Sequence, residues 1–151
     1  MKLTMLLLIA TISMASSACS NLLDSELKVL DSSKKMNMCE YEGSVILVVN
    51  VASKCGYTYQ YEELQILWDK YKSKGLVVLA VPSNSFNQEK NKNSEVKEFC
   101  EVNFNITFPL SAITEVKGNN AHELFKWAKT NHGSSACLLY TSDAADERSS
   151  V

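Results

Sequence analysis

Five cysteines carry most of the chemistry that this sequence of 151 residues offers: Cys19, Cys39, Cys55, Cys100 and Cys137. A cysteine thiolate is a strong nucleophile and is also the form of the side chain that oxidants attack. The five form no Cys-x-x-Cys pair, and no histidine follows at the interval of a zinc site. We therefore expect no metal site and no bound cofactor, and the chemistry depends on where each thiol is held.

Cys55 lies between two segments of contrasting pattern. The nearly continuous apolar run SVILVVNVA at residues 44–52 is typical of a strand covered on both faces in a parallel sheet. Apolar side chains at intervals of three and four predict a helix over residues 59–74 that ends at Gly75. Free amides and the helix dipole favour a thiolate just before such a helix, and Lys54 adds positive charge. Position alone also fits a structural cysteine packed in a core.

The other elements predict a single α/β domain around this strand and helix. The run LVVLAVP at residues 76–82 indicates a second buried strand, which completes a right-handed crossover. The composition agrees, with 46% hydrophobic residues and a net charge of −2 that gives no basic surface for nucleic acid. The remaining expected elements are a short strand at 27–30, a helix at 94–104 capped by Ser94, a strand region at 105–116 interrupted by Pro109, and a helix at 121–133 ended by Gly133.

Residues 1–18 are typical of a secretory signal peptide. A lysine at position 2 precedes an apolar run of about a dozen residues and then small residues, shorter than the roughly 20 apolar residues of a membrane span. Cleavage before Cys19 would resemble a bacterial lipoprotein signal, although Ser16 stands where that pattern usually has leucine. We therefore expect export, either to the periplasm or to the membrane through a lipid anchor on Cys19.

Residues 134–151 fit nothing that precedes them. The segment CLLYTSDAADE resembles a translated adapter of transposon-based sequencing libraries, so we interpret 134–151 as a non-native tail and assign no role to Cys137. The alternative is a genuine, weakly structured tail. The domain itself is expected over residues 22–133, incomplete at its C-terminal end.

The segment around Cys55 closely resembles a family signature. NVASKCGYTYQYEELQILWDKY is similar to that of the glutathione peroxidases, in which Asn-Val-Ala-Ser precedes selenocysteine or cysteine, then glycine and a threonine before the helix. The segments VLAVPSNSF, SEVKEFCEVNFNITFPL and VKGNNAHELFKWAK resemble later parts of the family, so the likeness covers residues 27–133. The resemblance implies a thioredoxin-like fold, with a central mixed sheet flanked by helices, and reduction of hydrogen peroxide and organic hydroperoxides.

The resemblance also implies roles for individual residues. Cys55 is the peroxidatic residue, which attacks a peroxide oxygen and becomes a sulfenic acid, and Lys54 supports it. Gly56 lets the chain turn tightly and lets the substrate approach. Ser85 stands where the family has glutamine, and its shorter hydroxyl would need a bridging water. Cys100 matches the cysteine that resolves the sulfenic acid as a disulfide in members that use thioredoxin; packing in the apolar face of its helix is the alternative.

Two departures limit the expected activity, and one rival function stays open. The Trp-Asn-Phe motif of the family is absent, and the last strands and helix would be missing with it, so the chain as given is expected to be poorly active.

No insertion of the kind used for assembly occurs, which indicates a monomer reduced by glutathione or thioredoxin. A thiol–disulfide oxidoreductase is disfavoured without Cys-x-x-Cys. The alternative is an inactive binding module or redox sensor that signals through a Cys55–Cys100 disulfide.

Overall fold

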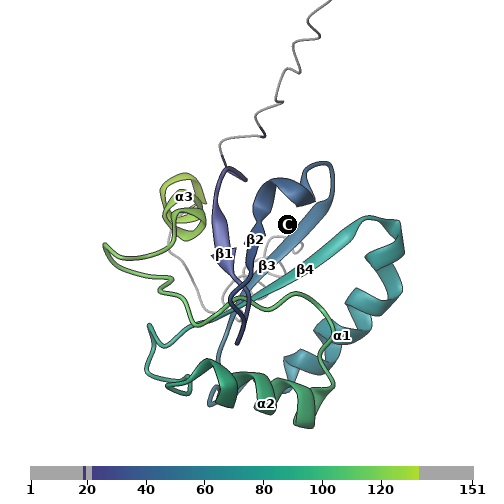
Figure 1. The fold of residues 1–151 in the computed structure, drawn as a ribbon, viewed down its shortest axis with the longest axis vertical. Coiled ribbons are helices and arrows are strands. Elements are labelled where there is room, and N and C mark those ends of the chain that lie inside the picture. Colours follow the sequence, from purple (N-terminus) through teal and green to yellow (C-terminus); the bar gives the residue numbers. More distant parts are fainter. Residues whose placement is uncertain (1–18, 20–21, 133–151) are drawn as a thin grey trace, which may run out of the picture.

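The computed structural model describes residue 19 and residues 22–132 of the chain (Figure 1). The expected signal peptide at 1–18, Gly133 and the tail at 134–151 with Cys137 lie outside the described residues. The fold is built on two parallel strands, β3 (Val45–Val51) and β4 (Leu76–Pro82). They are joined by α1 (Gln60–Tyr71) and the short 3₁₀ helix η2 (Lys72–Lys74).

The predicted crossover and its helix stop are confirmed. The strands pair in register from Val45 opposite Leu76 to Val51 opposite Pro82. The connection from helix to β4 turns at Gly75, whose φ of 89° lies in the left-handed region that favours glycine. Side chains of β4 alternate between two apolar clusters, so this strand is buried on both faces.

The first cluster lies between the sheet and the helices α1 and α2 (Asn93–Phe104). In Figure 1, α1 runs down the right of the strands and α2 runs across the bottom. The prediction that Ser94 caps α2 is wrong. The helix begins at Asn93, so Ser94 lies in its first turn, and Lys92 is the capping position without a side-chain hydrogen bond. The Asn93 side chain instead accepts a hydrogen bond from the Ile113 N–H at 2.8 Å, which fixes the start of α2 against the following segment.

The second cluster lies on the opposite face of the sheet. It is covered by the antiparallel pair β1 (Glu26–Lys28) and β2 (Lys35–Asn37), by the 3₁₀ helix η1 (Met38–Tyr41) and by α3 (Glu123–His132), which lie together in Figure 1. Met38 and Leu79 are fully buried in this cluster. The sheet is therefore covered on both sides, as the apolar runs predict.

The expected strand region at 105–116 forms only two single-residue bridges in the described structure. Leu110 bridges Ala80 in parallel and Ser111 bridges Val29 in antiparallel orientation. Pro109 lacks the N–H that a longer ladder requires, although its carbonyl accepts a hydrogen bond from the Ala80 N–H at 3.0 Å. This segment joins the β1–β2 hairpin to β4 without becoming a strand.

Within the described residues, β3 pairs only with β4, so its second edge carries no strand. Val45, at the start of β3, is 71% exposed, whereas the end of the strand that leads to the Cys55 loop is buried. None of the helices in the described part of the chain is long and apolar enough to cross a membrane.

Candidate active site

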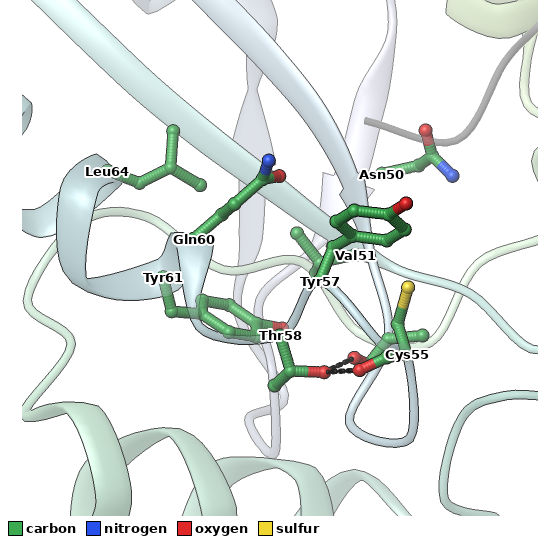
Figure 2. Close-up of a pocket in the computed structure, with 9 residues that line it drawn as sticks. Asn50, Val51, Cys55, Tyr57, Thr58, Gln60, Tyr61 and Leu64 are labelled. Atoms are coloured by element: carbon green, nitrogen blue, oxygen red, sulfur yellow. Dashed lines mark hydrogen bonds between the residues drawn. The ribbon is translucent and has the colours of Figure 1, made fainter. Parts of the chain in front are cut away.

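Cys55 lies in a tight loop that follows the buried end of β3. Thr58 closes this loop, because its hydroxyl donates to the Ala52 carbonyl at 3.1 Å and to the Cys55 carbonyl at 2.5 Å. The Thr58 N–H donates to the same Cys55 carbonyl at 3.2 Å. Figure 2 shows both side-chain bonds, and the Cys55 side chain pointing from the loop toward the Tyr57 ring rather than toward Tyr61.

A small cavity of about 20 Å³ adjoins the half-buried, free thiol of Cys55. This volume is enough for about one water-sized molecule. The side-chain amide of Gln60 lies beside the cavity, whereas the Asn50 amide points away from Gln60, Leu64 and Tyr61 (Figure 2). The Oε1 atom of Gln60 is buried without a hydrogen-bond partner among the described residues. The other lining residues are Val51, Ala52, Tyr57, Thr58, Tyr61 and Leu64.

The helix starts farther from Cys55 than the sequence suggests. Four residues separate Cys55 from Gln60, the first residue of α1. The intervening turns engage the first helical amides, since Gln60 N–H donates to the Tyr57 carbonyl and Tyr61 N–H to the Thr58 carbonyl. The helix dipole acts mainly within its first turn, so the loop itself, rather than the helix end, determines the immediate surroundings of Cys55.

The two supporting residues next to Cys55 are both exposed and do not line the cavity. The Lys54 backbone N–H donates to the Gln88 carbonyl at 2.8 Å, which holds this side of the loop. A Cβ atom added to Gly56 would meet no atom within 4 Å. The open space beside Gly56 leaves the approach to the loop unobstructed, and the roles of Lys54 and Gly56 in catalysis stay predictions.

Ser85 makes its hydrogen bonds outside the Cys55 cavity. Its hydroxyl donates to the Glu115 carboxylate at 2.7 Å and accepts from the Val116 N–H at 3.1 Å and from the Ser83 hydroxyl at 3.0 Å. Ser85 is not among the residues that line the cavity. Its serine hydroxyl therefore joins β4 to the segment before α3, and the part that it takes in peroxide chemistry stays a prediction.

We expect Ser85→Ala to lower the free energy of unfolding by about 1–3 kcal/mol, because it leaves the N–H of buried Val116 without a partner. Urea unfolding of the variant measures this effect. The rate of Cys55 oxidation by peroxide should stay within about threefold of wild type, because Ser85 does not line the Cys55 cavity. A tenfold slower oxidation with unchanged stability would instead give Ser85 the role of the family's glutamine.

Cys100 is fully buried in the first apolar cluster and is free. Burial raises the pKa of its thiol to about 11, so the thiol is protonated near neutral pH. The Tyr61 ring, which packs against Phe104 with centroids 5.2 Å apart, brings its hydroxyl beside this thiol. Tyr61 also lines the Cys55 cavity and therefore borders both cysteines.

Cys39 has a partner that the sequence did not indicate. It forms a disulfide with Cys19, with Cα atoms 5.6 Å apart. The Asn37 side chain caps η1 by accepting from the Cys39 N–H at 3.0 Å, which fixes Cys39 for this bond. Asp24 offers a carboxylate oxygen within 4.8 Å of both sulfur atoms, but sulfur atoms joined as a disulfide offer no thiolate to a metal ion.

Several residues of this site were not singled out from the sequence. Asn50 is a buried polar residue within an otherwise apolar strand, and that irregularity was a usable signal. Tyr61 was assigned to the apolar stripe of α1, where it does pack, but its hydroxyl end reaches the site. Gln60 carries no signal beyond that of an ordinary polar residue, because its place at the cavity depends on how the Cys55 loop closes.

The comparison with known proteins identifies the family. A model of the glutathione peroxidase family matches residues 22–129, more than half of the 151 residues. The chain belongs to the glutathione peroxidase family. The matched segment contains the Cys55 loop, the parallel strands and both helices of the first cluster.

Relatives within the glutathione peroxidase family come from bacteria, an alga and yeasts. A glutathione peroxidase homolog BsaA of Halalkalibacterium halodurans is 46% identical over 97 residues, which cover 64% of this chain and 62% of the relative. A glutathione peroxidase-like peroxiredoxin of Chlamydomonas reinhardtii is 47% identical, covering 60% of this chain and 57% of the relative. A hydroperoxy fatty acid reductase of Synechocystis is also 47% identical, covering 58% and 53%. The chain thus spans about three fifths of the length of the curated relatives that it matches.

Solved structures support the same fold. The apo form of Trgpx aligns with a TM-score of 0.56 and 30% identity, covering 80% of this chain and 70% of that one. The GPX1 of T. cruzi aligns with a TM-score of 0.56 and 27% identity, covering 78% and 74%. A secreted disulfide oxidoreductase of Mycobacterium tuberculosis, 11% identical with a TM-score of 0.52 and coverage of 73% and 69%, shares the fold alone. The thioredoxin-like α/β fold predicted from the sequence is confirmed.

Proposed function

We propose that the protein is a thiol-dependent peroxidase that reduces hydrogen peroxide and organic hydroperoxides through Cys55. The observation that carries this proposal is a free, half-buried thiol beside a cavity of about 20 Å³ that Gln60 also lines. A space of this size is enough for one oxygen of a hydroperoxide and leaves an organic remainder outside. The names of the peroxiredoxin and fatty acid hydroperoxide reductase relatives support the same substrate class.

The first step follows from the arrangement of the cavity. The Cys55 thiolate attacks one peroxide oxygen, the O–O bond breaks, and the sulfur becomes a sulfenic acid. The other oxygen leaves as hydroxide or alkoxide and takes up a proton to give water or an alcohol. In this proposal the side-chain amide of Gln60, a residue that lines the cavity, donates a hydrogen bond to the oxygen that gains charge.

The second half of the cycle returns Cys55 to its thiol. In our proposal the Cys100 thiol attacks the sulfenic acid, forms a Cys55–Cys100 disulfide and releases water, after which the dithiol of a thioredoxin reduces the disulfide. Because Cys100 is fully buried in α2, this step needs local unfolding of that helix. With glutathione, one molecule instead forms a mixed disulfide at Cys55 and a second releases it. The protein acts as a monomer in either cycle.

Peroxide consumption by the purified protein, supplied in turn with thioredoxin and with glutathione, tests this function. Sulfenic acid formation at Cys55, trapped by a carbon nucleophile and located by mass spectrometry, reports the first step without any reductant. Trapping at Cys55 supports the proposal. If Cys55 reacts with peroxide no faster than glutathione does in free solution, the proposed function is wrong.

We further propose that the protein is exported and that Cys19 is a disulfide partner rather than a lipid attachment site. A disulfide is stable in an oxidising compartment and rare in the cytosol, and the pairing of Cys19 with Cys39 fits the signal-like sequence of residues 1–18. A thioether to lipid would consume the same sulfur atom. The bond holds Leu22 and Leu23 against the second apolar cluster.

In the exported protein we expect trypsin without reductant to release the Cys39 peptide, residues 36–54, joined to the Cys19 peptide that ends at Lys28. Cys39→Ala should separate the two peptides and lower the free energy of unfolding by about 3 kcal/mol, the typical effect of a disulfide that closes a short loop. Intact mass after export distinguishes the alternatives. A diacylglyceryl group on Cys19 would contradict this assignment.

A further inference from the structure

The loop that carries Cys55 is held from outside by two consecutive residues, Gln88 and Glu89. The Gln88 carbonyl accepts from the Lys54 N–H at 2.8 Å, and the Glu89 Oε1 atom accepts from the Ser53 N–H at 3.1 Å. These are the two amides directly before Cys55. The segment after β4 therefore fixes the backbone that leads into the reactive residue.

Glu89 is unusual because it is a carboxyl group in the interior. It is only 2% exposed, and it is the one charged residue among the buried polar residues of the described chain. Besides the Ser53 amide, its Oε1 atom accepts from the Lys90 N–H at 2.7 Å. Its own N–H donates to the Asn84 side chain at 3.2 Å. Burying a carboxyl group is costly unless it gains such bonds.

The second carboxylate oxygen of Glu89 lies among other buried polar groups that have no hydrogen-bond partner in the described residues. Its Oε2 atom is buried without a hydrogen-bond partner among the described residues, and so is the hydroxyl of Ser53. The Tyr61 hydroxyl is also buried and makes no hydrogen bond of ordinary geometry there. Burial, and then the charges of Cys100, Glu89 and Cys55, raise the pKa of Tyr61, which places these groups around one interior region. A buried polar group left this way calls for a functional reason or a bound water.

We propose that Glu89 is a positioning residue for the peroxidatic thiol: its carboxyl group holds the Ser53 amide and thereby fixes the loop that aims Cys55 into its cavity. This inference rests on the proposed peroxidase function. It assigns no contact between Glu89 and the substrate. Glu89 holds the loop through its acceptor oxygen rather than through its charge, because both hydrogen-bond partners of Oε1 are neutral backbone amides.

The test compares Glu89→Ala, Glu89→Gln and Leu124→Ala in the full chain. Glutamine keeps a carbonyl oxygen for the Ser53 amide, whereas alanine removes it. Leu124→Ala is the matched control, because Leu124 is buried in α3 within the second cluster and does not line the Cys55 cavity. Two quantities are measured below the unfolding temperature of every variant: the rate of Cys55 sulfenic acid formation with hydrogen peroxide, and hydrogen exchange at the Ser53 amide.

We expect Glu89→Ala to slow Cys55 oxidation by about tenfold or more, as small misplacements of a reacting group do, and to speed Ser53 exchange. Glu89→Gln and Leu124→Ala should stay within about threefold of wild type in both quantities. The inference is overturned if Glu89→Ala oxidises at the wild-type rate, if its Ser53 exchange is unchanged, or if glutamine or the control slows oxidation as much as alanine does. If Cys55 of the wild-type protein is oxidised slowly, the proposed peroxidase function is contradicted instead. Hydrogen exchange at the Ser53 amide then still shows whether Glu89 restrains the loop.

Discussion

Cys55→Ser should abolish sulfenic acid formation and lower peroxide consumption by at least about 100-fold, because a serine hydroxyl neither ionises near neutral pH nor oxidises as a thiolate does. Cys55 is the free cysteine that lines the cavity, whereas the other free cysteine of the described residues is fully buried. Peroxide loss, followed with thioredoxin and with glutathione in separate assays, measures the effect. Trapping of the sulfenic acid shows which sulfur reacts.

The serine variant should unfold at nearly the wild-type urea concentration, because the exchange occurs in a half-buried loop held by Thr58. If Cys55→Ser consumes peroxide as fast as wild type with either reductant, Cys55 is not the peroxidatic residue.

Cys100→Ala should stop thioredoxin-supported turnover almost completely, by about 100-fold, while a sulfenic acid still forms and persists at Cys55. Alanine is preferred to serine here, because a serine hydroxyl would bring a more polar group into this fully buried position. The first oxidation should proceed within about threefold of the wild-type rate, since Cys100 does not line the cavity. Single-turnover mass spectrometry separates the two steps.

Wild-type protein treated with one equivalent of peroxide should show a Cys55–Cys100 disulfide by peptide mapping. Because burial raises the pKa of the Cys100 thiol to about 11, that thiol should resist alkylation in the reduced protein at pH 7 until α2 opens. Val102→Ala provides a control in the same helix, because Val102 is exposed. Undiminished thioredoxin turnover by Cys100→Ala would remove the resolving role and leave Cys100 as a packing residue.

The elements that position Cys55 could be predicted because each has an uninterrupted pattern. The two continuous apolar runs are typical of buried parallel strands, and they form β3 and β4. Gly75 marks the end of the helical segment between them. The segment around Pro109 could not be predicted as well. Its pairing depends on which distant backbone groups reach it, and a missing N–H limits that pairing to single bridges.

The details of the site depended on tertiary contacts that leave no periodic trace. Glu89 stands in a run of polar residues that is typical of an exposed loop, yet loop closure buries it against Ser53. Ser85 was assigned by its alignment with the family, but the hydrogen bonds of its hydroxyl go to Glu115 and Val116. Cys39 lies in a polar connection, and only the folding of η1 brings it to Cys19.

The strand that ends at the Cys55 loop has one edge without a neighbour in the described residues. Its sequence, VILVVNV, contains no charge and no proline, the features that usually prevent another extended segment from docking there. A strand from the same polypeptide would reach this edge at an effective concentration of about a millimolar, far above that of neighbouring molecules. The free edge of β3 can therefore be covered in two ways, either by a strand of the same polypeptide or by a strand of another molecule. Because the same strand leads into the Cys55 loop, a strand that pairs with this edge would contact the element that positions the thiol.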